Sequence, residues 1–198
     1  GYAGWPCAFV RLTGCNLRCS YCDTQYAFYE GTEMTVEEVV RAVEAYPTNL
    51  VLVTGGEPML QEPVGGLLDT LIGTGYTVLL ETGGQAPLAG VNPLVHKIVD
   101  FKCPSSGMAG RNDYGNVQCL TQGDEVKLVV GDREDFDWAC GLVRRFDLTS
   151  RAGAVTFSPV HGRLPAADLA QWVLHCGLRV RIQLQLHKII WPGVPRGV

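Results

Sequence analysis

Along this chain of 198 residues, short continuous apolar runs alternate with segments in which apolar residues are spaced every three or four positions. Short apolar and β-branched runs, such as the one at 50–54, predict strands that are buried on both faces. Between them, apolar residues recur every three or four positions, which predicts helices. We expect strands at 7–12, 50–54, 77–81, 97–101, 125–130, 154–157 and 178–186, and helices at 36–45, 64–72, 133–146 and 166–176.

Two of these segments carry sharper signals. Thr35 and Glu38 stand three residues apart at the start of a helical pattern, which is the spacing of a capping box. The segment 178–186 alternates strictly between apolar and polar residues. This alternation predicts a strand whose apolar side packs against a layer and whose polar side lines a wet space.

The order of the elements predicts the fold class. Strands that alternate with helices favour an α/β protein with a parallel sheet and right-handed crossovers. Several strands end in polar or glycine-rich turns, so we expect a site at their carboxyl ends. The connections at 23–34 and 103–124 show no helical pattern. The expectation is therefore a single domain, 1–198, folded as an incomplete, helix-poor (β/α) barrel.

Composition narrows the classes of function. A net charge of -4 with scattered Lys and Arg argues against a nucleic-acid-binding surface. The apolar runs are too short to span a membrane, and the start of the chain lacks the layout of a signal peptide. Eight cysteines without a secretory signal favour the reducing cytoplasm over a disulfide framework.

Three cysteines stand together, with the spacing C-x3-C-x2-C at Cys15, Cys19 and Cys22. Soft thiolates select zinc or iron–sulfur centres. Structural zinc normally takes four ligands from two separated pairs, and the other five cysteines form no second pair. A 4Fe–4S cluster held by three thiolates keeps one iron open, as a catalytic metal site requires.

This cysteine spacing is similar to the signature of the radical S-adenosylmethionine (SAM) family, in which SAM chelates the open iron. The turn Thr-Gly-Gly-Glu-Pro at 54–58 resembles the family element that holds the SAM amino group, which implies that Gly56 contacts SAM. On its own, a Gly-Gly turn after a strand is usually only a turn.

Five segments together, at 9–24, 54–58, 100–107, 157–161 and 183–188, resemble one branch of that family. The branch contracts the ring of 6-carboxy-5,6,7,8-tetrahydropterin to a carboxylated 7-deazapurine, with loss of ammonia. The resemblance implies a 4Fe–4S cluster, SAM and Mg2+, a flavodoxin- or ferredoxin-type electron donor, and a homodimer. Two alternatives stay open: another radical SAM enzyme, such as a glycyl-radical activase, or a zinc-stabilised binding module.

The resemblance also implies residue roles. Arg11 corresponds to an arginine that grips the substrate carboxylate, a task for which a planar guanidinium is suited. Expected substrate contacts are Arg11, Thr54, His187 and Val198; expected SAM contacts are Tyr21, Cys22, Asp23, Gly56, Asp100, Phe101, Lys102, Ser158, Pro159, Val160 and His161.

Thr24, directly after Cys22 and Asp23, matches a threonine through which the branch binds Mg2+. A hydroxyl is a hard oxygen ligand suited to that ion. A threonine that caps the loop is an equally valid interpretation of the local sequence. Members of the branch begin with an extra strand and a Gln-Gly-Glu segment that helps to hold the pterin. This sequence opens at Gly1, so we expect that part of the pocket to be missing from it.

Overall fold

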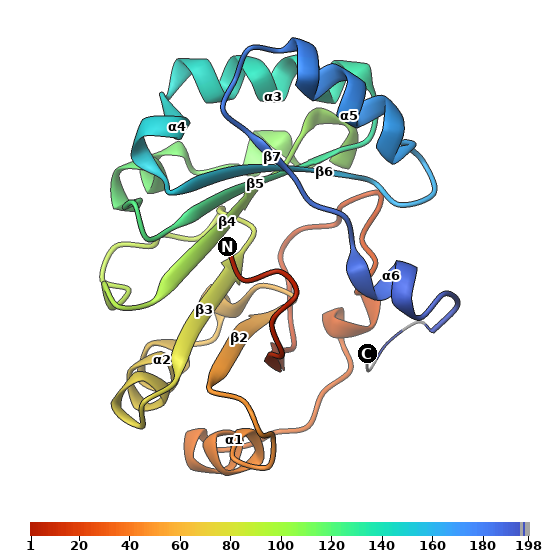
Figure 1. Ribbon diagram of the computed structural model, residues 1–198. Helices are drawn as coiled ribbons and strands as arrows, with labels where there is room; N and C mark the ends of the chain where they lie inside the picture. Colours follow the sequence, from red (N-terminus) through yellow and green to blue (C-terminus); the bar gives the residue numbers. More distant parts are fainter. Residues whose placement is uncertain (195, 197–198) are drawn as a thin grey trace.

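The computed structural model describes residues 1–194 and 196, and its centre is one parallel sheet (Figure 1). Seven strands lie side by side in chain order, and each pairs in parallel with the next. The sheet is not closed, so the incomplete barrel expected from the sequence is confirmed. The strands are β1 Ala8–Leu12, β2 Leu50–Gly55, β3 Thr77–Thr82, β4 His96–Phe101, β5 Glu125–Val130, β6 Ala154–Pro159 and β7 Arg181–Ile182.

The first five helices cover the outer face of the sheet in two groups, and the sixth lies apart from them (Figure 1). On this face, one apolar cluster joins the first two helices to β1–β3. A second, called the outer apolar cluster below, joins the third and fifth helices to β4–β6. Thr35 and Glu38 form the expected capping box, in which each side chain accepts from the other residue's backbone N–H. The helices are α1 Val36–Val43, α2 Val64–Gly73, α3 Arg133–Arg145, α4 Leu148–Arg151, α5 Ala166–His175 and α6 Leu186–Ile190.

The two long connections contain only short stretches of 3-10 helix, as their lack of a helical pattern suggested. Between β1 and α1 there is one such turn, Gln25–Phe28, and between β4 and β5 there are three. In place of a crossover helix, the last of the turns between β4 and β5 packs against the outer apolar cluster of β4–β6. The remaining turns are Pro58–Leu60, Pro104–Ser106, Ala109–Arg111 and Tyr114–Cys119.

The strand expected at 178–186 is wrong for most of its length. Only Arg181 and Ile182 pair with β6, and the chain then turns into α6, which carries His187. Strict alternation indicates an extended chain with two different faces, but a strand also needs a backbone partner. At this edge of the sheet, β6 offers such a partner over two residues, followed by one further bond from Gln183 N to Phe157 O at 3.0 Å.

The inner face of the sheet is layered. Leu52, Leu79 and Ile98 belong to a small apolar cluster that also contains Leu50 and Cys7. Side chains two positions apart on a strand share a face. The next inward residues are therefore Thr54, Glu81 and Asp100, which place a polar layer above the apolar one at the carboxyl ends.

Candidate cofactor and substrate site

The cysteine loop follows β1 and is fixed at both ends. At its start, Gly14 N donates to Ala27 O at 2.8 Å. Further along, Ser20 N donates to Ser106 O at 3.0 Å, and Ser20 Oγ donates to Ser105 O at 2.7 Å. The loop is therefore held by the turn Gln25–Phe28 at its start and by the turn Pro104–Ser106 further along.

Cys15, Cys19 and Cys22 are half-buried free thiols on this loop. Burial raises the pKa of Cys15 and of Cys19, and the proximity of Cys22 raises both further, while the ammonium of Lys102 opposes these effects. Within residues 1–194 and 196, no three His, Cys, Asp or Glu side chains converge on a single ion position. In an iron–sulfur cluster the thiolates bind different irons, so three soft donors spaced along one loop fit such a cluster.

The Gly-Gly turn after β2 packs directly on the cysteine loop. Gly56 N donates to Leu12 O at 2.9 Å, and Glu57 N donates to Gly14 O at 2.7 Å. A Cβ on Gly56 would lie 2.1 Å from Gly14 O and 3.0 Å from Cys15 Cβ. Glycine is thus required here by close approach of two backbones, whether or not SAM also contacts this turn.

Glu57, in the same turn, has a structural role that the sequence analysis missed. Its side chain is 1% exposed and fully bonded. Oε1 accepts from Thr82 Oγ1 at 2.7 Å and from Met59 N at 3.1 Å, while Oε2 accepts from Gly83 N at 2.8 Å. This carboxylate therefore ties the carboxyl end of β2 to that of β3.

Two ion pairs occupy the polar layer inside the sheet. Lys127 Nζ lies 2.8 Å from Glu81 Oε1, and Lys102 Nζ lies 2.8 Å from Asp100 Oδ2. Burial opposes ionisation of both lysines, but the carboxylates outweigh it and raise their pKa values. Lys127 likewise lowers the pKa of Glu81. Glu81 and Lys127 were not identified from the sequence, because nothing local marks an inward-facing charged pair.

Asp100 offers an open acceptor toward this interior. Its residue is 8% exposed, and Oδ1 has no hydrogen-bond partner in the described part of the chain. A buried carboxylate oxygen without a partner is costly unless a ligand donates to it. This observation fits an expected cofactor contact.

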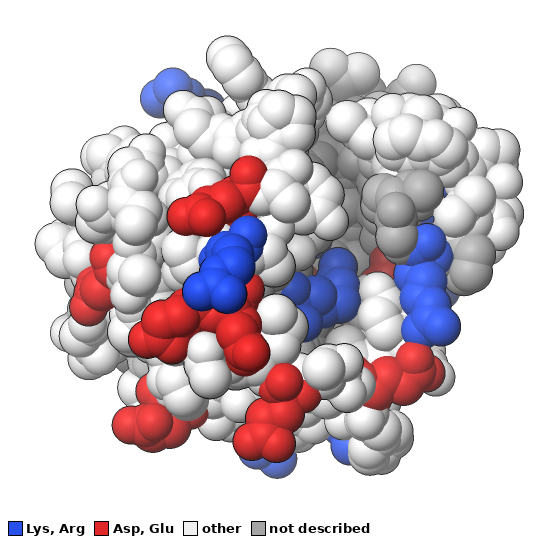
Figure 2. All heavy atoms as spheres, turned by 90° about the horizontal axis from the view of Figure 1, so that it is seen from below, with Lys and Arg blue, Asp and Glu red and all other residues white. Residues whose placement is uncertain are grey.

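Figure 2 shows that the molecule is hollowed when viewed from below and that basic side chains lie within the hollow.

The structure brings together three of the four expected substrate residues. Arg11 and Thr54 are register partners on β1 and β2, and Arg11 Nη1 donates to Gly55 O at 3.2 Å. His187 lies near Arg11 and Asp23; burial is the main cause that lowers its pKa. Val198, the fourth expected contact, lies outside the described residues.

Asp23 connects the cysteine loop to the C-terminal segment. Its Oδ2 accepts from Gln185 Nε2 at 2.6 Å and lies 3.2 Å from Lys188 Nζ. Burial would raise the pKa of Asp23, but Gln185 and Lys188 outweigh it and lower that pKa. The side chain of this expected SAM contact is therefore engaged by α6 and the residue before it.

Thr24 occupies the N-cap position of the turn Gln25–Phe28, yet its side chain makes no capping hydrogen bond. The bond that closes the turn uses its main chain, since Ala27 N donates to Thr24 O at 2.9 Å. The hydroxyl contacts Cys22 Sγ at 3.8 Å. The hydroxyl therefore does not cap the turn and lies beside Cys22 of the cysteine loop.

The remaining expected SAM residues differ in whether their side chains are buried or line an open pocket. Tyr21 OH donates to Val129 O at 3.2 Å, and burial raises the pKa of this phenol. Phe101 is fully buried in the outer apolar cluster against Tyr114, so only its main chain could face the interior. Ser158 and Val160 are buried at the end of β6. An open pocket of about 380 Å³ lies beyond β6, and it is lined by Pro159, His161, Arg163, Leu184, Gln185 and Ile189, among others.

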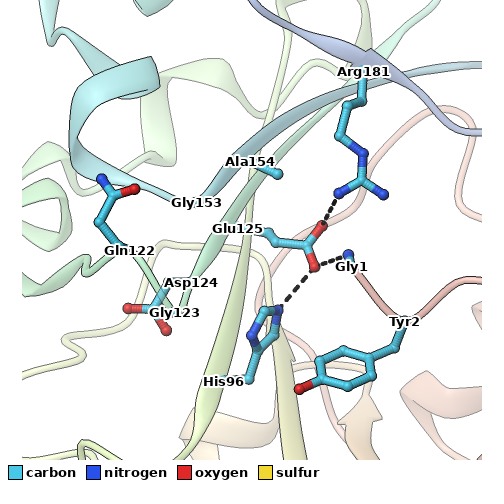
Figure 3. Close-up of a pocket in the computed structure, with 10 residues that line it drawn as sticks. All are labelled: Gly1, Tyr2, His96, Gln122, Gly123, Asp124, Glu125, Gly153, Ala154 and Arg181. Atoms are coloured by element: carbon cyan, nitrogen blue, oxygen red, sulfur yellow. Dashed lines mark hydrogen bonds and ion pairs between the residues drawn. The ribbon is translucent and has the colours of Figure 1, made fainter.

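A separate pocket of about 320 Å³ lies at the amino ends of β4–β7 (Figure 3). Glu125 points into it and contacts His96 at 2.9 Å, Arg181 at 4.0 Å and the ammonium group of Gly1. Despite burial, the hydrogen bond with His96 helps to lower the pKa of Glu125 to about 2. No expected site residue lines this pocket, so the candidate site belongs to the carboxyl ends of the strands.

Comparisons with known proteins point to one family. The sequence model of the Radical SAM superfamily matches residues 9–99. A 7-carboxy-7-deazaguanine synthase of Koribacter versatilis is 43% identical over 211 residues, covering 100% of this chain and 93% of that protein. The enzyme of the same name from Chlorobaculum tepidum is 46% identical over 200 residues, covering 100% of this chain and 90% of that protein.

Solved structures agree on the fold. Streptococcus suis SuiB bound to S-adenosylmethionine is similar with a TM-score of 0.67 at 13% identity, over 96% of this chain and 53% of that one. SuiB bound to its precursor peptide SuiA gives a TM-score of 0.70 at 12% identity, over 93% of this chain and 50% of that one. This chain thus spans about half the length of SuiB, and at such low identity the similarity concerns the fold alone.

Proposed function

This chain belongs to the family of 7-carboxy-7-deazaguanine synthases within the radical SAM superfamily, and on that premise we propose its reaction. It is a lyase that contracts 6-carboxy-5,6,7,8-tetrahydropterin to 7-carboxy-7-deazaguanine with loss of ammonia, a step toward queuosine and other 7-deazapurines. The observation that carries the proposal is the packing of the cysteine loop on the Gly-Gly turn, beside Arg11 and Thr54.

Cys15, Cys19 and Cys22 would hold a 4Fe–4S cluster, with SAM between the cysteine loop and the ends of β2, β4 and β6. When bound, these cofactors supply the one-electron and radical chemistry of the reaction. The protein orients the substrate and excludes water. The apolar layer of Leu52 and Leu79 forms the floor of this interior.

Arg11 is the residue we assign to the substrate carboxylate. Its guanidinium lies at the carboxyl end of β1, where a bidentate pair can form. We expect Arg11→Ala to weaken binding of the pterin by ~2–4 kcal/mol while SAM binding stays unchanged. Calorimetric titration with each ligand measures both, and Arg41→Ala on the exposed face of α1 is the control. Equal loss of affinity for both ligands would identify Arg11 as a purely structural residue.

Thr24 is the residue we assign to Mg2+. Its hydroxyl forms no cap, and a hard oxygen donor beside the pocket suits an ion that completes its shell with water and substrate. We expect Thr24→Ala to need more Mg2+ and to turn over more slowly, with an unchanged iron content. A Mg2+ titration of product formation, native beside variant, measures this. Overlapping curves with equal plateaus would contradict the role.

Further features rest on family resemblance. We propose a flavodoxin- or ferredoxin-type electron donor, a homodimer and a cytoplasmic location. The eight free cysteines fit a reducing compartment. In the described residues, no helix has both the length and the hydropathy needed for a membrane span.

The assay that tests the function combines anaerobically reconstituted protein with SAM, a reductant and the carboxylated pterin. We expect the deazapurine and ammonia to form in equal amounts. Reductive cleavage of SAM without product would favour another radical SAM enzyme, such as a glycyl-radical activase. A colourless protein that binds only zinc would favour the binding module, because the d10 zinc ion has no visible absorption.

A further inference from the structure

Arg18, inside the cysteine loop, is an exposed side chain that turns back on the loop itself. Its Nη1 donates to Cys15 O at 2.7 Å and to Leu17 O at 2.7 Å. One guanidinium nitrogen therefore binds two backbone carbonyls in the stretch that joins the first two cysteines. Hydrogen bonds from a charged donor are stronger than neutral ones.

The same guanidinium rests on an aromatic surface from another segment. Its Cζ lies 4.3 Å from the ring centroid of Phe28 and 5.7 Å from that of Tyr29. Nη2 donates to Tyr29 OH at 3.2 Å, and the two rings pack edge to face at 6.0 Å. Cation–π contacts of this length are attractive. Arg18 thus joins the cysteine loop to the connection that leads to α1.

Among the described residues, no other side chain in this part of the loop makes a comparable set of polar contacts, although Leu17 is buried. Asn16 makes one, accepting from Gln85 Nε2 at 2.8 Å. Gly14 and Ser20 anchor the two ends, while Leu17 N donates only to Cys15 Sγ at 3.4 Å. Arg18 is therefore the main polar anchor of the stretch between Cys15 and Cys19, in addition to the buried side chain of Leu17.

We propose that Arg18 is a positioning residue, which clamps the loop on Phe28 and Tyr29 so that Cys15 and Cys19 are arranged for the cofactor before it binds. The clamp rests on the proposed function only in that these cysteines serve as cluster ligands. Its effect on the backbone exists in the metal-free chain, where it is measured separately.

The first test is hydrogen exchange of the metal-free chain. Two hydrogen bonds to carbonyls, one to the Tyr29 hydroxyl and the contacts with two aromatic rings, all at the surface, correspond to roughly tenfold or more in local opening. We expect Arg18→Ala to accelerate exchange of the amides in 15–22 about tenfold, with β5 unchanged. Arg133→Ala is the matched control, because Arg133 also lies over aromatic rings, at 5.5 Å from Phe136, but on α3. A second variant, Phe28→Leu, keeps the hydrogen-bonding groups and should give a smaller acceleration.

The second test measures iron loss from the reconstituted protein to a chelator. We expect Arg18→Ala to lose iron about tenfold faster than the native protein and Arg133→Ala to lose it at the native rate. Native exchange rates at 15–22 in Arg18→Ala, or equal acceleration in β5, overturn the clamp. If the native chain binds no iron while exchange at 15–22 still responds to Arg18→Ala, the clamp stands and the proposed function fails.

Discussion

Cys19→Ala should bind no 4Fe–4S cluster and cleave no SAM, while the fold persists. Cys19 is the middle ligand of the loop, and two remaining thiolates leave two irons without protein ligands. The other cysteines offer no ready substitute: Cys7, the next nearest in sequence, packs against the small apolar cluster of the inner face, and Cys103 is 0% exposed within the outer apolar cluster of β4–β6. Cys19 itself is only half-buried and lies outside the apolar clusters, so its loss creates no core cavity.

Iron analysis and visible absorption of anaerobically reconstituted protein measure the first part, and thermal unfolding of the metal-free chains measures the second. Cys119→Ala is the control, since Cys119 is also a half-buried free thiol but lies at the end of Tyr114–Cys119. It should keep about four irons per chain. Retention of about four irons by Cys19→Ala would show that the ligand assignment is wrong.

The fold was largely predictable because its signals are local. Five consecutive residues at 50–54 predict the buried strand that the structure extends to Gly55, and the capping box at Thr35 marks the start of α1. The segment at 178–186 shows the limit of such reasoning. Its alternation is real, but the strand depends on the short register shared with β6, which no local pattern reveals.

The candidate site was predictable only in part for the same reason. The cysteine spacing is contained within eight residues, so it is visible in the sequence. By contrast, Lys127 and Glu81 stand 46 positions apart, and only the sheet brings them to 2.8 Å.

A second example is Asp135, which looks like an ordinary acidic residue at a helix start. In the fold it is 0% exposed and accepts from Ser105 N and Gly131 N, each at 2.8 Å. Its carboxylate thereby holds the turn at 104–106, on which Ser20 of the cysteine loop docks. Support of this kind arises from packing and has no signature in the sequence.

We expect a second large loss of activity from a substitution in the Gly-Gly turn, because this turn packs closely on the cysteine loop. Gly56→Ala places a Cβ 2.1 Å from Gly14 O, whereas carbon and oxygen atoms in contact need about 3.3 Å or more. The atom met first, Gly14 O, is backbone, so the strain is relieved by moving either the Gly-Gly turn or Gly14 together with the adjoining Cys15. Forcing extra volume into packed structure typically costs about 1–3 kcal/mol of stability.

Displacement of Cys15 should matter more for function than for stability, since a shift of ~1 Å at a reacting site can cost roughly 100-fold in rate. We therefore expect Gly56→Ala to reconstitute less iron and to turn over at least ~100-fold more slowly, with a lowered midpoint of thermal unfolding. Gly66→Ala is the matched control: a Cβ there meets nothing within 4 Å, and the residue lies in α2. That change should stabilise the fold by ~0.5–1 kcal/mol and leave iron content and turnover at the native level. Native iron content and rate in Gly56→Ala would show that the cysteine loop moves aside without consequence, and the close packing of these two turns would then have no part in positioning the cofactor.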